Sequence, residues 1–108
     1  MKWGDWSRSG WEVIGDLAIP ETDPVIPEDF EALTEAVWMA VGPGGYAIDI
    51  GWYPESDPSG QWQCRVVAPG GAEQWLHPVE EFKGKSTTAM RAWVDAACAR
   101  IEATLALN

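Results

Sequence analysis

The sequence predicts an α+β fold: an antiparallel sheet of about four strands with two helices packed on one face. Three observations support this fold class. Two alternating segments, 46–53 and 61–68, flank a turn-rich loop, residues 27–40 place apolar side chains at helical spacing, and residues 86–107 do so over a longer stretch. With 108 residues the chain suits one domain, 1–108, with its own core.

The expected strands follow from alternation of apolar and polar residues. Residues 11–19 predict a first strand, with Gly15 as a possible bulge. Segments 46–53 and 61–68 predict an antiparallel hairpin, because the loop between them is rich in proline, serine and glycine. Residues 73–79 predict the last strand, which makes the element order strand, helix, strand, strand, strand, helix.

The first helix is expected over residues 27–40. Pro27 suits the first helical turn, and the acids that follow it favour the positive end of a helix dipole. Phe30, Leu33 and Val37 recur at helical spacing, and a Gly-Pro-Gly-Gly turn ends the segment. A second interpretation stays open, in which residues 36–41 form a strand and this turn makes a hairpin.

The second helix is the clearest element of the sequence. Ser86 or Thr87 can cap its first turn, and the helix is expected to run to about Leu107. Apolar residues repeat along one face, and Arg91 and Asp95 form an i,i+4 pair on its flank. We expect this long amphipathic helix to lie across the sheet and close the core.

The remaining composition limits the cellular setting and the chemistry. The eight tryptophans supply most of the aromatic bulk, which predicts that most of them fill the core. The amino-terminal residues lack the pattern of a secretory signal, and no segment has the roughly 18 apolar residues of a membrane span. Cys64 and Cys98 fit no metal-ligand spacing, so we expect buried thiols, a cytoplasmic protein, and neither metal nor cofactor.

The charge of −10 is segregated along the chain. Residues 9–64 hold eleven acids and neither lysine nor arginine, whereas residues 65–108 hold five acids and five bases. Surfaces that only keep a protein in solution usually mix both signs. This segregation favours a surface that docks on a basic partner, because complementary fields accelerate association and select the partner.

One part of the acidic stretch places several acids on one predicted surface. On the expected first helix, Glu28, Glu31 and Glu35 form a row, with neighbouring carboxylates about 5–6 Å apart. The candidate partner-binding residues are therefore Glu21, Asp23, Glu28, Asp29, Glu31 and Glu35, with Trp38 as an apolar anchor. Trp3 and Trp6 are alternatives for the anchor.

Other kinds of site are less well supported by the sequence. The single histidine, His77, precedes Pro78, and Asp49 is expected on the solvent face of its strand, so neither indicates a catalytic centre. The glycine-rich turns lack the spacing of a phosphate-binding loop, and Glu55 and Asp57 lack that of a calcium loop. Direct nucleic-acid binding is disfavoured because the chain has only seven lysine and arginine residues against seventeen acidic residues.

In size and charge the chain resembles small inhibitors of nucleic-acid enzymes, namely the anti-CRISPR proteins of phages and the immunity proteins that neutralise nuclease toxins. This resemblance implies a non-enzymatic binding protein that covers the basic nucleic-acid-binding surface of an enzyme or ribonucleoprotein, as a monomer or homodimer. One alternative is a phage or bacterial accessory or structural module that oligomerises through tryptophan-rich surfaces. Another is a small enzyme that uses His77 and Asp49.

Overall fold

The computed structural model describes residues 10–14, 22–34, 37–70 and 78–106. In this part of the chain five strands precede one α-helix: β1 (Glu12–Val13), β2 (Trp38–Val41), β3 (Ala47–Tyr53), β4 (Gln61–Val67), β5 (Glu80–Gly84) and α1 (Thr87–Ala106). Two short 3-10 helices, η1 (Pro27–Ala32) and η2 (Pro43–Gly45), lie between strands. The fold is α+β, as the sequence predicts.

The sheet is an antiparallel meander in which each strand pairs with the next one along the chain, in the order β1-β2-β3-β4-β5. The hairpin predicted over 46–53 and 61–68 is confirmed, with Trp52 opposite Trp62 and Ile48 opposite Val66. Its predicted inner face is also confirmed, because Ile48, Trp52 and Trp62 are all buried. This face of the sheet is therefore apolar and needs a cover.

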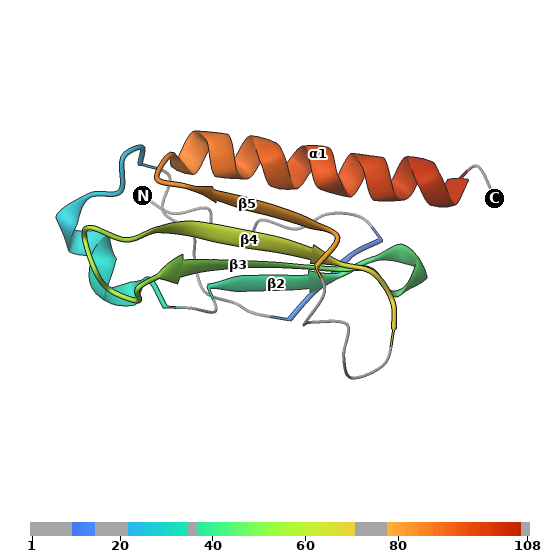
Figure 1. Cartoon of the computed structure of the whole chain (residues 1–108), viewed down its shortest axis with the longest axis horizontal. Helices are drawn as coiled ribbons and strands as arrows, with labels where there is room; N and C mark the ends of the chain where they lie inside the picture. Colours follow the sequence, from blue (N-terminus) through green and yellow to red (C-terminus); the bar gives the residue numbers. More distant parts are fainter. Residues whose placement is uncertain (1–9, 15–21, 35–36, 71–77, 107–108) are drawn as a thin grey trace.

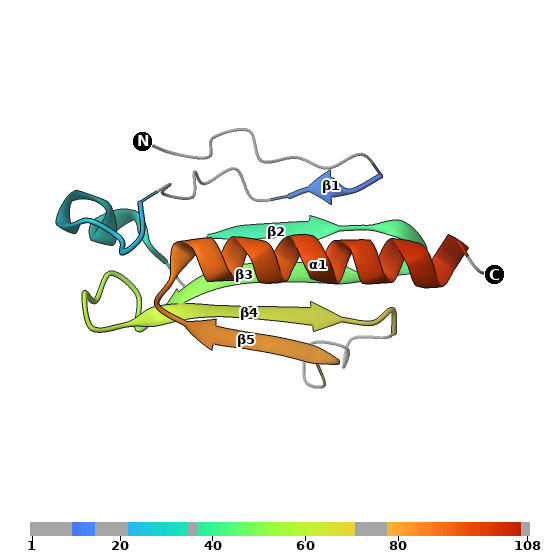
Figure 2. The same ribbon diagram turned by 90° about the horizontal axis from the view of Figure 1, so that it is seen from above.

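Helix α1 covers that face and runs along the strands (Figures 1 and 2). It begins where the sequence predicts, since the Oγ of Ser86 accepts a hydrogen bond from the backbone N–H of Ala89 at 3.0 Å. The residues of α1 that are buried against the sheet are Met90, Val94, Ala97, Cys98 and Ile101. A hydrogen bond between Trp62 Nε1 and Thr87 Oγ1, 3.2 Å long, joins the sheet to the first turn of α1 inside the core.

The helix predicted over residues 27–40 is wrong. Residues 27–32 form the 3-10 helix η1, Leu33 that follows it is extended, and residues 38–41 form strand β2. The alternative interpretation, a strand ending at the Gly-Pro-Gly-Gly turn, is the correct one. Gly44 in this turn has φ +70°, and an added Cβ would lie 3.0 Å from the side chain of Leu105 on α1.

The sheet edges also differ from the prediction. The described part of the predicted strand 11–19 contains only the two-residue β1, and residues 15–19 lie outside the described residues. The last described strand is β5 at Glu80–Gly84; of the strand predicted over 73–79, residues 73–77 lie outside the described residues, and Pro78 and Val79 are not in a strand. The described sheet thus has five strands, and α1 is the α-helix on its face, where four strands and two helices were expected.

Candidate acidic binding surface

Two acidic segments that lie about 25 positions apart in the sequence meet at one end of the molecule. Helix η1 packs on the loop between β3 and β4, residues 54–60 (Figure 1). Ser56 makes the joint: its N–H donates to the carbonyl oxygen of Leu33 at 2.7 Å, and its Oγ donates to that of Glu31 at 3.1 Å. The fold therefore brings Glu55 and Asp57 to the same end as the acids of η1.

Aromatic packing supports this joint from below. The rings of Phe30 on η1 and Trp52 on β3 lie 5.6 Å apart, and Trp52 meets Trp62 edge to face at 5.1 Å. The indole N–H of Trp52 donates to the backbone oxygen of Asp57 at 2.8 Å. The buried side chain of Trp52 thus connects both η1 and the 54–60 loop to the core, which fixes the position of the acidic residues on these two segments.

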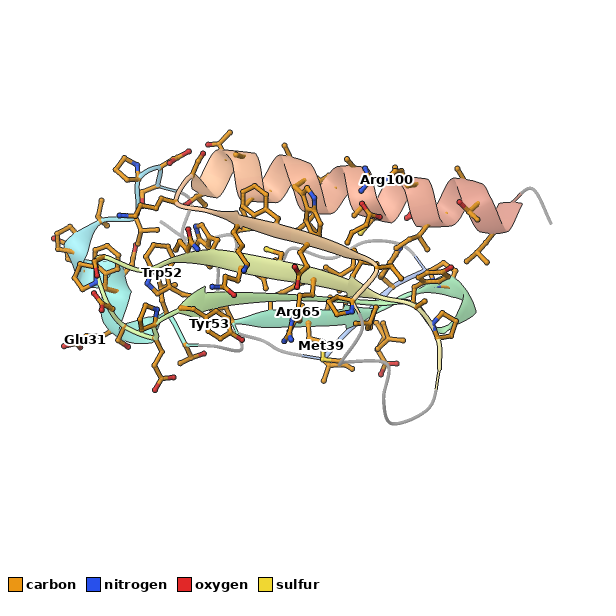
Figure 3. All side chains as sticks on the ribbon, in the orientation of Figure 1. Glu31, Met39, Trp52, Tyr53, Arg65 and Arg100 are labelled. Atoms are coloured by element: carbon orange, nitrogen blue, oxygen red, sulfur yellow. The ribbon has the colours of Figure 1, made fainter. Side chains whose placement is uncertain are left out.

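We call this surface the acidic end. Its members are the carboxylates of η1, of the 54–60 loop and of the segment before η1: Asp23, Glu28, Asp29, Glu31, Glu55 and Asp57. Four of the six are exposed, and Asp29 and Asp57 are half-buried. Figure 3 shows Glu31 at this end, pointing away from the sheet. The positive charge of the exposed Lys85 contributes to lowering the pKa of Asp57.

Hydrogen bonds lower the pKa of two of these carboxylates. Asp57 accepts hydrogen bonds from the Oγ and the N–H of Ser59 at 2.7 and 2.8 Å, which lower the pKa of its carboxyl. Asp23 accepts from Ser86 Oγ at 2.6 Å and from the N–H of Thr88 at 3.1 Å, and these bonds lower its pKa. Asp23 therefore also holds the first turn of α1, a structural role that the sequence analysis did not assign to it.

The predicted binding residues are partly brought together. Glu28, Asp29 and Glu31 share η1, where Glu28 and Glu31 lie one turn of a 3-10 helix apart, so they remain on one side. The row predicted on an α-helix does not form, because η1 ends before position 35. Glu21 and Glu35 lie outside the described residues, as do Trp3 and Trp6.

The predicted anchor Trp38 does not face solvent. It lies on β2 opposite Ile50 and is 7 % exposed, so it is a core residue and offers no surface to a partner. The apolar surface at the acidic end comes from other residues. Ile26 is 36 % exposed, and Pro24, Pro27, Pro54 and Pro58 are also exposed.

The residues considered for catalysis do not form a site in the described part of the chain. Asp49 pairs across the strands with Arg65, whose Nη2 lies 2.8 Å from its Oδ2, and Glu81 is the next residue across the sheet. The hydrogen bond to Asp49 raises the pKa of the Arg65 guanidinium. Arg65 points to the face away from α1, together with Met39 and Tyr53 (Figure 3). His77 lies outside the described residues.

A pocket of about 320 Å³ lies toward the opposite end of the molecule. Its lining comes from the start of β3, the start of β5 and the second half of α1: Tyr46, Val79, Glu80, Arg100, Ile101 and Thr104. Its two charged groups, Glu80 and Arg100, form an ion pair with each other. The carboxylate of Glu80 is therefore paired with Arg100, and the pocket offers no unpaired carboxylate for acid–base chemistry among the residues that line it.

Comparisons with protein-family models, curated proteins and solved structures gave no match to this chain. Among the described residues, no three histidine, cysteine or acidic side chains lie where they could hold a metal ion. No helix in the described ranges is both long and apolar enough to cross a membrane.

Proposed function

We propose that this chain is a non-enzymatic binding protein whose acidic end docks on a basic protein surface. The observation that carries the proposal is the joint at Ser56, which places the acids of η1 and those of the 54–60 loop on one supported surface. Exposed carboxylates on a fixed frame lose little conformational freedom when they bind. Ile26 and the neighbouring prolines add apolar contact area between the charges.

The finer proposal concerns the kind of partner. Closely spaced carboxylates can occupy the basic surface that an enzyme or ribonucleoprotein uses for nucleic acid, so binding there would inhibit it. Thiols at Cys64 and Cys98, both buried, suit action in a reducing cytoplasm.

The alternative of oligomerisation through tryptophans has less support. Of the tryptophans in the described ranges, Trp11, Trp38, Trp52 and Trp62 are buried, and Trp93 is half-buried. These residues therefore present no broad tryptophan surface to a second copy.

A charge-reversal pair tests the docking surface. The variant E28K/E31K should bind poly-L-lysine about tenfold or more weakly than the wild type, because attraction becomes repulsion. The matched control E12K/D95K makes the same change in net charge at exposed acids on β1 and α1. Nuclear magnetic resonance titration should show poly-L-lysine shifts concentrated at residues 26–31 and 54–59. Equal loss of affinity in the two variants would refute the proposal.

Position 55 tests the part of the site that depends on the fold. E55K should weaken binding by about as much as E31K alone, because Ser56 holds both positions at the same end. An unchanged affinity of E55K would show that the loop does not belong to the binding surface. For a natural partner, capture from cell extract should weaken steeply with salt, and DNA should compete with the chain for the captured enzyme.

A further inference from the structure

Strand β5 lies at the edge of the described sheet and pairs there with β4 alone (Figure 2). In an edge strand every second residue directs its backbone N–H and C=O away from the sheet, where another strand can pair with them. The five residues of β5 are Glu80-Glu81-Phe82-Lys83-Gly84. The order of charged and aromatic residues in β5 indicates which strand would pair with this edge.

The sequence of β5 is complementary to itself when two copies run antiparallel about Phe82. In that register Phe82 lies opposite the partner's Phe82, and Glu81 lies opposite the partner's Lys83. Because the arrangement has a two-fold axis, the pair of opposite charges occurs twice. Opposite charges in directly facing positions stabilise an antiparallel pair of strands, and like charges there destabilise it.

The apolar side of the same edge is incompletely covered. Phe82 points to the α1 side of the sheet, where its ring lies 5.9 Å from that of Trp93. Both side chains pack against the core and are only partly buried. A second copy in the register centred on Phe82 would bury this aromatic pair against its symmetry mate, which adds apolar burial to the backbone hydrogen bonds.

The orientation of this register also limits the repulsion between two acidic chains. β5 ends at Gly84, and the next residue, Lys85, interacts electrostatically with Asp57. This end of β5 is therefore the one nearer the acidic end. Antiparallel pairing therefore points the two acidic ends in opposite directions along the 45 Å length of each molecule. Surface charges separated by more than about 8 Å are largely screened at physiological salt.

We propose that the chain forms a homodimer through antiparallel β5–β5 pairing centred on Phe82, which joins two five-stranded sheets into one. The dimer leaves both acidic ends accessible and facing outward. The interface is small, so the dimer forms in a concentration-dependent equilibrium with the monomer. This inference does not rest on the docking function of the acidic end.

Sedimentation equilibrium over a range of concentrations tests the dimer with three variants. K83E places like charges opposite each other twice and should weaken dimerisation about tenfold or more. The swap E81K/K83E restores opposite charges across the axis and should recover most of the affinity. K85E makes the same charge change as K83E just outside β5, and it should leave the dimer close to the wild type.

A monomeric wild type at every concentration, equal effects of K83E and K85E, or no recovery in the swap variant would each overturn the proposal. Circular dichroism checks that the variants fold. Amide hydrogen exchange of the wild type gives a measurement that needs no variant: amides of β5 should become more protected as concentration rises, whereas those of the 54–60 loop should not. E28K/E31K should dimerise like the wild type, so failure of the docking proposal and failure of this one are distinguishable.

Discussion

Asp23 belongs to the acidic end, but its contacts make it part of the framework as well. Its Oδ2 accepts hydrogen bonds from Ser86 Oγ and from the N–H of Thr88, both at the start of α1. The carboxylate thus fixes the segment before η1 to the helix that closes the core. Glu28 and Glu31, by contrast, are exposed on η1 itself.

The change Asp23→Asn should lower the free energy of unfolding by up to about 1 kcal/mol at neutral pH, because the amide oxygen can still accept both hydrogen bonds but lacks the charge that strengthens them. The pKa of Asp23 is lowered in the folded state, so its contribution is present above the ordinary value of 3.8 and is lost as pH falls through the folded pKa. The difference between wild type and D23N in urea denaturation should therefore shrink in acid. E31Q is the control, and an equal effect of E31Q would contradict the capping role.

The two cysteines should be unreactive in the folded protein. Cys64 is fully buried on the inner face of β4, and burial raises the pKa of its thiol because the thiolate is disfavoured away from water. Cys98 is buried on α1. Titration with a thiol reagent should proceed slowly in native buffer and at once in denaturant. Rapid reaction of both thiols under native conditions would show that α1 does not stay packed on the sheet.

At the scale of elements, Trp52 connects the acidic end to the core. Replacing it with phenylalanine keeps an aromatic ring but removes the indole N–H that binds the carbonyl oxygen of Asp57. W52F should cost at least about 1 kcal/mol of stability, because the space left by the smaller ring adds to the loss of the hydrogen bond. Hydrogen exchange should become faster in the 54–60 loop and unchanged in β5. Uniform acceleration across the sheet would mean that Trp52 supports the whole core and not this joint.

The segment 27–41 shows why the sequence was ambiguous at this point. Phe30 and Leu33 are three positions apart, a spacing that suits an α-helix and a 3-10 helix alike. The chain leaves the helical conformation at Leu33, which is extended and buried. Beyond it Val37 donates its N–H to the carbonyl oxygen of Ile50 at 2.8 Å, so pairing with β3 decides the conformation. Such a long-range contact is not visible in local spacing.

The strand β5 was missed for a different reason. Its sequence alternates Glu81, Phe82 and Lys83, and only the phenylalanine contributes to the core. Strands at the edge of a sheet often carry charged side chains, so they lack the apolar alternation that identifies inner strands. The inner hairpin, by contrast, was predicted in detail because Ile48, Trp52 and Trp62 must all turn to one buried face.

The candidate site depended on the fold more than on the sequence. The acids of η1 could be recognised from their order in the chain, but nothing in that order places Glu55 beside Glu31. The contact arises because the β3–β4 hairpin returns its loop to the end of the sheet where η1 packs. The signal in the sequence was the absence of bases through both segments, which indicates a shared surface only when both lie at one end.

At the scale of the whole molecule, the acidic residues gather at one end of the long axis. The described structure is elongated, with extents of 45, 26 and 21 Å, and the acidic end occupies one tip of it while the pocket lined by Tyr46 and Arg100 lies toward the other. The part of the sequence after position 64 has balanced charges. A basic partner would therefore meet the molecule tip first, oriented by its field before contact.

The position of α1 after all five strands has a consequence for synthesis of the chain. The meander can pair strand by strand as it emerges, because every neighbour in the sheet is also a neighbour in sequence. Its apolar face, with Trp52 and Trp62, then waits uncovered until α1 has left the ribosome. During that interval the partly folded chain would expose this aromatic surface, which makes it prone to association with chaperones or with other unfolded chains.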